Sequence, residues 1–77
     1  GTTKFTATPA GTNTLAYKLS SAAKTANLYA HSVGLIAYTS SANIPATVGQ
    51  FLNMYELDTD GGIAKFASHE IVLADIA

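Results

Sequence analysis

An apolar run interrupted once by a tight acidic turn constrains the fold of this chain more than any other feature. The run spans residues 49–76, GQFLNMYELDTDGGIAKFASHEIVLADI, with large apolar side chains on both sides of DTDGG at residues 58–62. Gly tolerates a positive φ and Asp hydrogen-bonds its own backbone, so this segment is typical of a turn between two strands. The run therefore predicts an antiparallel β-hairpin, and it contains no recognisable reactive group.

Alternating side chains predict two further strands near the amino terminus. Residues 2–8 read TTKFTAT, in which Phe and the following Ala share one face. Residues 14–20 read TLAYKLS, in which Leu, Tyr and Leu point inward and Lys18 points outward. This period of two is the pattern of half-buried strands, and the PAGTN segment between them contains turn residues.

The middle of the chain is less regular. Residues 21–34, SAAKTANLYAHSVG, show no helical stripe or capping box, so we expect a long loop with one helical turn, whose Leu28, Tyr29 and Val33 pack over a sheet edge. Residues 35–40 predict another strand. Residues 43–46, NIPA, predict a turn because Pro lacks an amide donor and restricts the residue before it.

Short strands at about ten-residue spacing with turn chemistry between them predict an all-β fold. We expect residues 1–77 to form a single small antiparallel immunoglobulin-like β-sandwich of five to seven strands. The expected large core side chains are Phe5, Leu15, Tyr17, Leu19, Ile36, Phe51, Tyr55, Leu57, Ile63, Phe66, Ile71 and Leu73.

Composition excludes several classes of function. The chain of 77 residues has a net charge of −1, 12% charged residues and no Arg, so it lacks the cationic clusters that nucleic acid binding needs. The absence of Cys excludes disulfides, thiolate catalysis and Cys-ligated zinc. No segment approaches the roughly 18 apolar residues of a membrane span, so membrane insertion is not expected.

The polar residues are mostly Thr, Ser and Asn, where a cytosolic surface would be rich in charge. This composition favours an exported protein exposed at a cell surface or in a cell wall. The chain begins at Gly1 without Met, which favours a domain excised from a larger surface protein.

The order of several short motifs resembles a known kind of module. The motifs are T-K-F-T-A-T-P-A, N-T-L-A-Y-K-L-S, A-Y-T-S-S-A-N-I, G-Q-F-L-N-M-Y-E-L-D and I-A-K-F-A-S-H-E-I-V-L-A-D-I. Together they resemble the repeat modules of surface and S-layer-associated proteins of Gram-positive bacteria, over nearly the whole chain. The resemblance implies an immunoglobulin-like module used in series as a stalk, spacer or adhesive unit, and it implies no catalytic residues.

The acidic turn offers one candidate cation site. Glu56, Asp58 and Asp60 followed by Gly and Ile mimic part of a calcium loop, because alternate loop residues can supply oxygen ligands. The twelfth position counted from Glu56 is Ala67, which is not a ligand. A hairpin turn with solvated carboxylates is therefore the main expectation, with no cofactor, and calcium is the alternative.

The tyrosines offer a candidate carbohydrate site. Aromatic rings exposed together can stack on the apolar faces of sugars. Alternation places Tyr17 and Tyr55 in the core, whereas Tyr29 and Tyr38 are the expected surface aromatics.

Other polar residues give weaker signals. His31 and His69 carry no metal-ligand spacing with Glu70 or Asp75, and Ser32 and Ser68 lack a nucleophile motif, so no enzyme activity is expected. Lys18 lies next to Glu56 in several conceivable strand registers, which predicts a cross-strand ion pair, with a Lys–Asn or Lys–Asp covalent cross-link beside the acid as the rarer alternative.

These observations predict a non-catalytic extracellular structural or spacer module that contacts neighbouring modules of the same protein. Two alternatives stay open. One is an adhesion module that binds cell-wall polysaccharide or a protein. The other is a self-associating subunit of a surface layer, filament or phage particle, which would pair through an uncovered strand edge.

Overall fold

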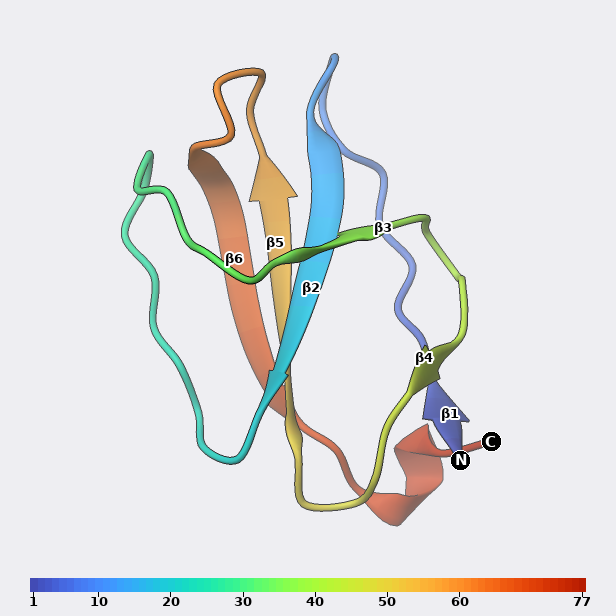
Figure 1. The fold of residues 1–77 in the computed structure, drawn as a ribbon. Helices are drawn as coiled ribbons and strands as arrows, with labels where there is room; N and C mark the ends of the chain where they lie inside the picture. Colours follow the sequence, from blue (N-terminus) through green and yellow to red (C-terminus); the bar gives the residue numbers. More distant parts are fainter.

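The computed structural model describes all of residues 1–77 and contains six strands and one 3-10 turn (Figure 1). These elements are β1 (Thr2–Thr3), β2 (Thr14–Ser20), β3 (Ile36–Tyr38), β4 (Ile44–Pro45), β5 (Phe51–Leu57), β6 (Ile63–Glu70) and η1 (Leu73–Asp75). Every strand pair is antiparallel. The predicted all-β fold and the predicted number of strands are confirmed.

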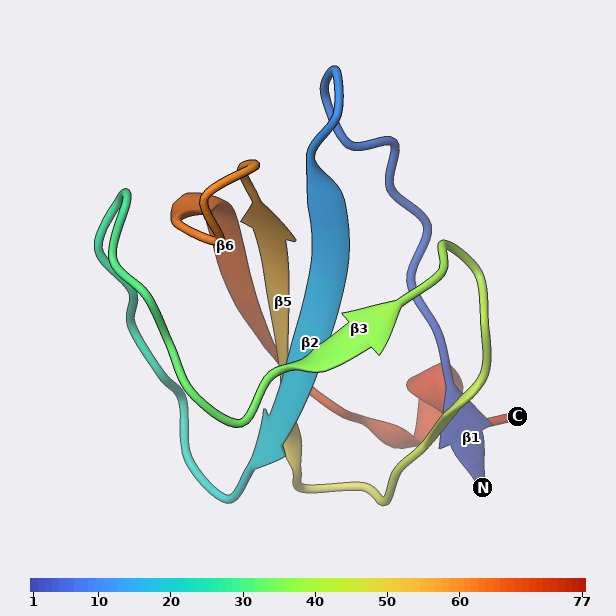
Figure 2. The same ribbon diagram turned by 45° about the horizontal axis from the view of Figure 1, so that its top comes forward.

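The strands form a four-stranded sheet in the order β3-β2-β5-β6 and a two-stranded sheet of β1 and β4. The predicted hairpin is β5 and β6, and β5 lies in the centre of the large sheet. Lys18 of β2 and Ser68 of β6 are both paired with Asn53 of β5. The small sheet and the amino-terminal segment cover one face of the large sheet, which gives a small β-sandwich (Figure 2). Its immunoglobulin-like character stays a prediction.

Period-two alternation divides the core between the two faces of the large sheet. On the first face, Leu52 packs with Ile44 and Ile71, which are 0% and 1% exposed. On the second face, Tyr55 and Ile63 form a smaller cluster that residues of the long loop cover. Each face therefore depends on segments outside the large sheet for its burial.

A polar side chain lies fully buried in the central strand. The amide nitrogen of Asn53 donates to the Lys18 carbonyl at 3.0 Å and to the Ser20 hydroxyl at 2.9 Å. Its amide oxygen accepts from the Ser68 hydroxyl at 2.8 Å. These bonds join β2, β5 and β6 and satisfy a group that would otherwise destabilise the core.

Two local predictions are wrong. Of residues 2–8, only Thr2 and Thr3 pair with another strand, although the predicted alternation of exposure persists through Phe5 and Ala7. Residues 43–46 contain strand β4, not only a turn, because Pro45 lies in a two-stranded edge position where its missing N–H is tolerated.

Several predicted burials are also wrong. Leu28, Tyr29 and Val33 are 65%, 73% and 84% exposed, so they do not pack over the sheet; smaller contacts from Ala26 and Leu35 cover that face. Two residues expected in the core are exposed as well: Ile36 and Leu73, at 52% and 79%. Ile36 lies on a short edge strand, and Leu73 lies in η1, which has no buried residue.

The two ends of the chain lie side by side (Figures 1 and 2). The Ala77 amide donates to the Thr2 carbonyl at 2.8 Å, and the Ala46 amide donates to the Gly1 carbonyl at 3.2 Å. No helix in the structure has the length and apolar character that crossing a membrane requires.

Candidate functional site

The outer edge of β6 is the longest unpaired strand edge in the molecule. β6 is the last strand of the large sheet and has eight residues, whereas β3 at the opposite edge has three. Only Ile63 is covered, because it exchanges backbone hydrogen bonds with Tyr29 and Ala30 of the long loop at 2.8 and 3.0 Å. The stretch from Lys65 to Glu70 has no backbone partner on this side. Such an edge is a template for pairing with another strand.

A groove of about 350 Å³ adjoins this edge on the first face of the sheet. It lies between the amino-terminal segment and the large sheet. Paired residues of β2, β5 and β6 form its floor. Its apolar lining includes Phe5, Leu15, Met54 and Ala67, with the charged Lys65 also at the groove. Because Lys65 and Ala67 belong to β6, the groove and the open edge form one continuous surface.

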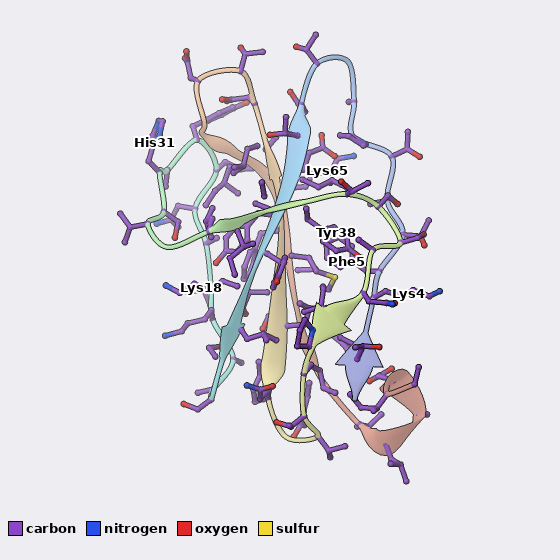
Figure 3. All side chains as sticks on the ribbon, turned by 45° about the vertical axis from the view of Figure 1, so that its right-hand side comes forward. Lys4, Phe5, Lys18, His31, Tyr38 and Lys65 are labelled. Atoms are coloured by element: carbon purple, nitrogen blue, oxygen red, sulfur yellow. The ribbon has the colours of Figure 1, made fainter.

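Tyr38 lies behind the groove lining and holds the lining residue Phe5 in place. The two rings stack with centroids 4.2 Å apart, and Figure 3 shows them together. The Tyr38 hydroxyl accepts a hydrogen bond from the Phe5 amide at 3.1 Å. It lies 3.0 Å from the Phe5 carbonyl and 2.6 Å from the Ala42 carbonyl, and it can donate its one proton to either of them. Tyr38 is half-buried, so its ring and hydroxyl are already engaged within the fold.

Glu56 is buried beside the groove and holds a turn in place. Its Oε2 accepts from the Asn13 side chain at 2.8 Å and from the Ala10 amide at 3.3 Å. These hydrogen bonds lower the pKa of Glu56, and the bond from Asn13 has the largest effect. Burial of the carboxyl acts in the opposite direction, and the nearby charge of Lys65 lowers the pKa by a smaller amount. The carboxylate therefore stays ionised and fixes residues 10–13 against β5.

Asp58 uses its carboxylate inside the hairpin turn. Its Oδ1 accepts from the amides of Asp60 and Gly62, both at 2.9 Å, and Gly61 has a φ of +83° that favours glycine. Asp60 is exposed. No group of three or more His, Asp or Glu side chains is positioned to hold a metal ion. Glu56, Asp58 and Asp60 therefore do not form a cluster of metal ligands. Calcium binding at this turn stays the untested alternative to a turn with solvated carboxylates.

Tyr29 is presented at the surface by a fixed backbone. It is 73% exposed and has a φ of +63°, a conformation that side chains other than glycine rarely adopt. Tyr55, by contrast, is 5% exposed, and Tyr17 packs against the core, as predicted. Tyr38 and Tyr29 lie in different surroundings, and carbohydrate binding through them stays a prediction.

The histidines do not form a shared site. His69 Nε2 lies 2.8 Å from Asp75 Oδ2, which also accepts from the Val72 amide at 2.9 Å. The Val72 amide and, second, His69 lower the pKa of Asp75, against the opposing effect of desolvation. His31 lies apart, beside Gly61. The His69–Asp75 contact therefore ties the end of β6 to η1.

The predicted Lys18–Glu56 pair is wrong. Lys18 is opposite Asn53, and Glu56 is opposite Leu15, so the two charges lie on opposite faces of the sheet. The Lys18 ammonium instead donates to the Val33 carbonyl at 3.4 Å. The open edge of β6 was the feature that sequence reasoning left unassigned, because strand order cannot be read from alternation alone.

A comparison with protein families identifies one match. The family model of the S-layer protein SbsC C-terminal domain matches residues 1–73. No curated protein and no solved structure matches the chain.

Proposed function

The chain belongs to the family of the S-layer protein SbsC C-terminal domain, and we propose that it is a non-catalytic subunit that associates with further copies of itself in a surface layer. Family membership makes the chain a surface-layer-related structural module of the cell exterior. The single observation that supports self-association is the uncovered edge of β6.

Pairing with the β6 strand of a second copy would satisfy the open backbone groups of both edges. With Ala67 on the two-fold axis of an antiparallel pair, Lys65 of one strand would lie opposite His69 of the other, on the same face of the joined sheet. Ala67 lies in the middle of the free stretch and is exposed, and its small side chain permits close approach. The sheet would then continue through both copies.

The test uses the absence of native cysteine. Ala67→Cys introduces one thiol at the proposed two-fold axis, where opposed Cβ atoms would come within disulfide range. We expect rapid disulfide dimers under mild oxidation, and light scattering of the unmodified chain that increases with concentration. The control is Ala37→Cys, on the exposed β3 edge. Equal cross-linking of the two variants, or a monomer at every concentration, would contradict the proposal.

The spacer and adhesion functions have less support. A module that adds length in series needs its two ends at opposite poles, whereas here the Ala77 amide bonds to the Thr2 carbonyl. Neighbouring modules joined at both ends would therefore leave this domain projecting sideways. Adhesion to polysaccharide would depend on Tyr29, and it is an outcome of the experiment described next.

A further inference from the structure

A two-fold contact between β6 edges closes after two copies, so a continuous layer needs a second contact that does not close. We propose that this contact is made by Tyr29 of one copy, seated in the groove beside β6 of another copy. The inference rests on the proposed function, because it adds a second interface to the edge pairing.

The Tyr29 side chain is held ready for binding. Its left-handed backbone conformation is maintained by three hydrogen bonds: Tyr29 amide to Ile63 carbonyl at 2.8 Å, Ile63 amide to Ala30 carbonyl at 3.0 Å, and Ala30 amide to Asn27 carbonyl at 3.2 Å. A strained conformation that the surrounding structure enforces is a common feature of binding sites. Fixing the backbone in advance also reduces the entropy lost when a partner binds.

The same loop carries other exposed apolar side chains. Leu28 and Val33 are 65% and 84% exposed, on either side of Tyr29 in the sequence. Tyrosine combines a large apolar ring with a polar hydroxyl and is enriched at interface centres. The loop therefore presents an aromatic anchor with apolar neighbours.

The groove offers complementary chemistry. Its volume of about 350 Å³ accommodates an aromatic ring, and Phe5 and Met54 supply an aromatic face and a polarizable thioether. Glu56 is already engaged by Asn13 and Ala10. Lys65 is exposed and has no salt-bridge partner, so its ammonium is free to meet the Tyr29 ring or hydroxyl.

The geometry requires two different copies. Residues of the Tyr29 loop cover the second face of the large sheet, at Tyr55 and Ile63, whereas the groove lies on the first face under the amino-terminal segment. In Figure 1 these two segments lie on opposite sides of the sheet. A contact between unlike surfaces of two copies leaves one of each surface unused, so it propagates.

The experiment uses a single fluorophore, because the chain has no Trp. Tyr29→Trp is titrated with copies carrying Tyr29→Ala, whose groove is intact. We expect the Trp emission to move to shorter wavelength as the ring leaves water. The matched control adds copies with both Tyr29→Ala and Ala7→Arg, in which a charged side chain enters the groove from a residue outside β6. We expect about tenfold weaker association with these copies, as for loss of a hot-spot contact.

Three outcomes would overturn the inference. The first is an equal emission shift with open and blocked grooves. The second is a shift with cell-wall polysaccharide but none with a second copy. The third is loss of the shift on Leu73→Ala in the added copies, since Leu73 is an exposed residue of η1 that does not line the groove. Cross-linking of Ala67→Cys distinguishes this failure from failure of the edge pairing, because a disulfide between the introduced thiols of two copies requires their β6 strands to meet, whether or not Tyr29 occupies the groove.

Discussion

At the scale of single residues, Asn53 should dominate the polar contribution to stability. Its side chain is 0% exposed and bonds to three strands. Asn53→Ala leaves the hydroxyls of Ser20 and Ser68 without this partner, and we expect it to lower the free energy of unfolding by about 1–3 kcal/mol. Urea unfolding measures this loss. Asn43→Ala, at an exposed position, is the control and should change it by less than about 0.5 kcal/mol.

Glu56 should make stability depend on pH. Its pKa is lowered in the folded chain from an ordinary value of 4.5, so its ionised form contributes stability above that value. This contribution is lost as the pH falls through the lowered pKa. We expect Glu56→Gln to reduce the urea midpoint at pH 7 and to approach the unmodified chain in acid. The pKa of Asp75 is also lowered, but Asp75 is present in both proteins and therefore does not change the difference between them. A difference in urea midpoint between Glu56→Gln and the unmodified chain that stays constant from pH 7 to strong acid would contradict this role.

At the scale of elements, the hairpin turn should depend on one of its two aspartates. Asp58 accepts from two amides of the turn, whereas no hydrogen bond of the Asp60 carboxylate is present. We therefore expect Asp58→Ala to destabilise the chain by about 1–2 kcal/mol and Asp60→Ala to have almost no effect. Thermal unfolding of the two variants compares them directly, and equal losses would show that turn charge, not the hydrogen bonds, matters.

Calcium at the same turn gives a separate prediction. A bound ion would raise the unfolding midpoint with concentration. Because Asp58 already bonds to the turn and Glu56 to Asn13, we expect the midpoint to be unchanged by millimolar calcium. A rise in the unmodified chain that is absent in Asp58→Ala would instead establish the calcium site.

The elements that the sequence predicted best are those whose signal is local. Strand β2 matches the predicted residues 14–20, and the turn matches residues 58–62, because alternation and turn chemistry act over neighbouring residues. Strand β4 was missed because its partner lies more than 40 residues away and Pro45 is a poor strand signal. The complete burial of Ile44 and Asn53 also depends on contacts between residues far apart in the sequence. The open edge of β6 follows from the order of the strands in the sheet, which local patterns do not reveal.

At the scale of the whole molecule, the adjacent chain ends allow the chain to be joined at its termini and opened elsewhere without disrupting the fold. Direct backbone bonds join residues 1–2 to Ala46 and Ala77, so a short Gly-rich linker can connect the two ends without strain. In the loop after β2, Ala22 and Ala23 are exposed and make no hydrogen bond to another backbone group, so a new start and end can be placed between them; the Ala22 carbonyl accepts only from the Ser20 hydroxyl, at 2.7 Å.

We therefore expect a circular permutant, joined from Ala77 to Gly1 and opened between Ala22 and Ala23, to unfold cooperatively with the same sheet signal in circular dichroism. Both hydrophobic clusters and every strand pair stay intact in it, since the opening lies outside them. Its stability should fall modestly, because Ala26 and Leu35 would then cover the second face from a freer segment. The control is a permutant opened within β5, between Asn53 and Met54, which should fail to fold. Failure of the first permutant alone would show that the loop and the chain ends are coupled more tightly than their contacts indicate.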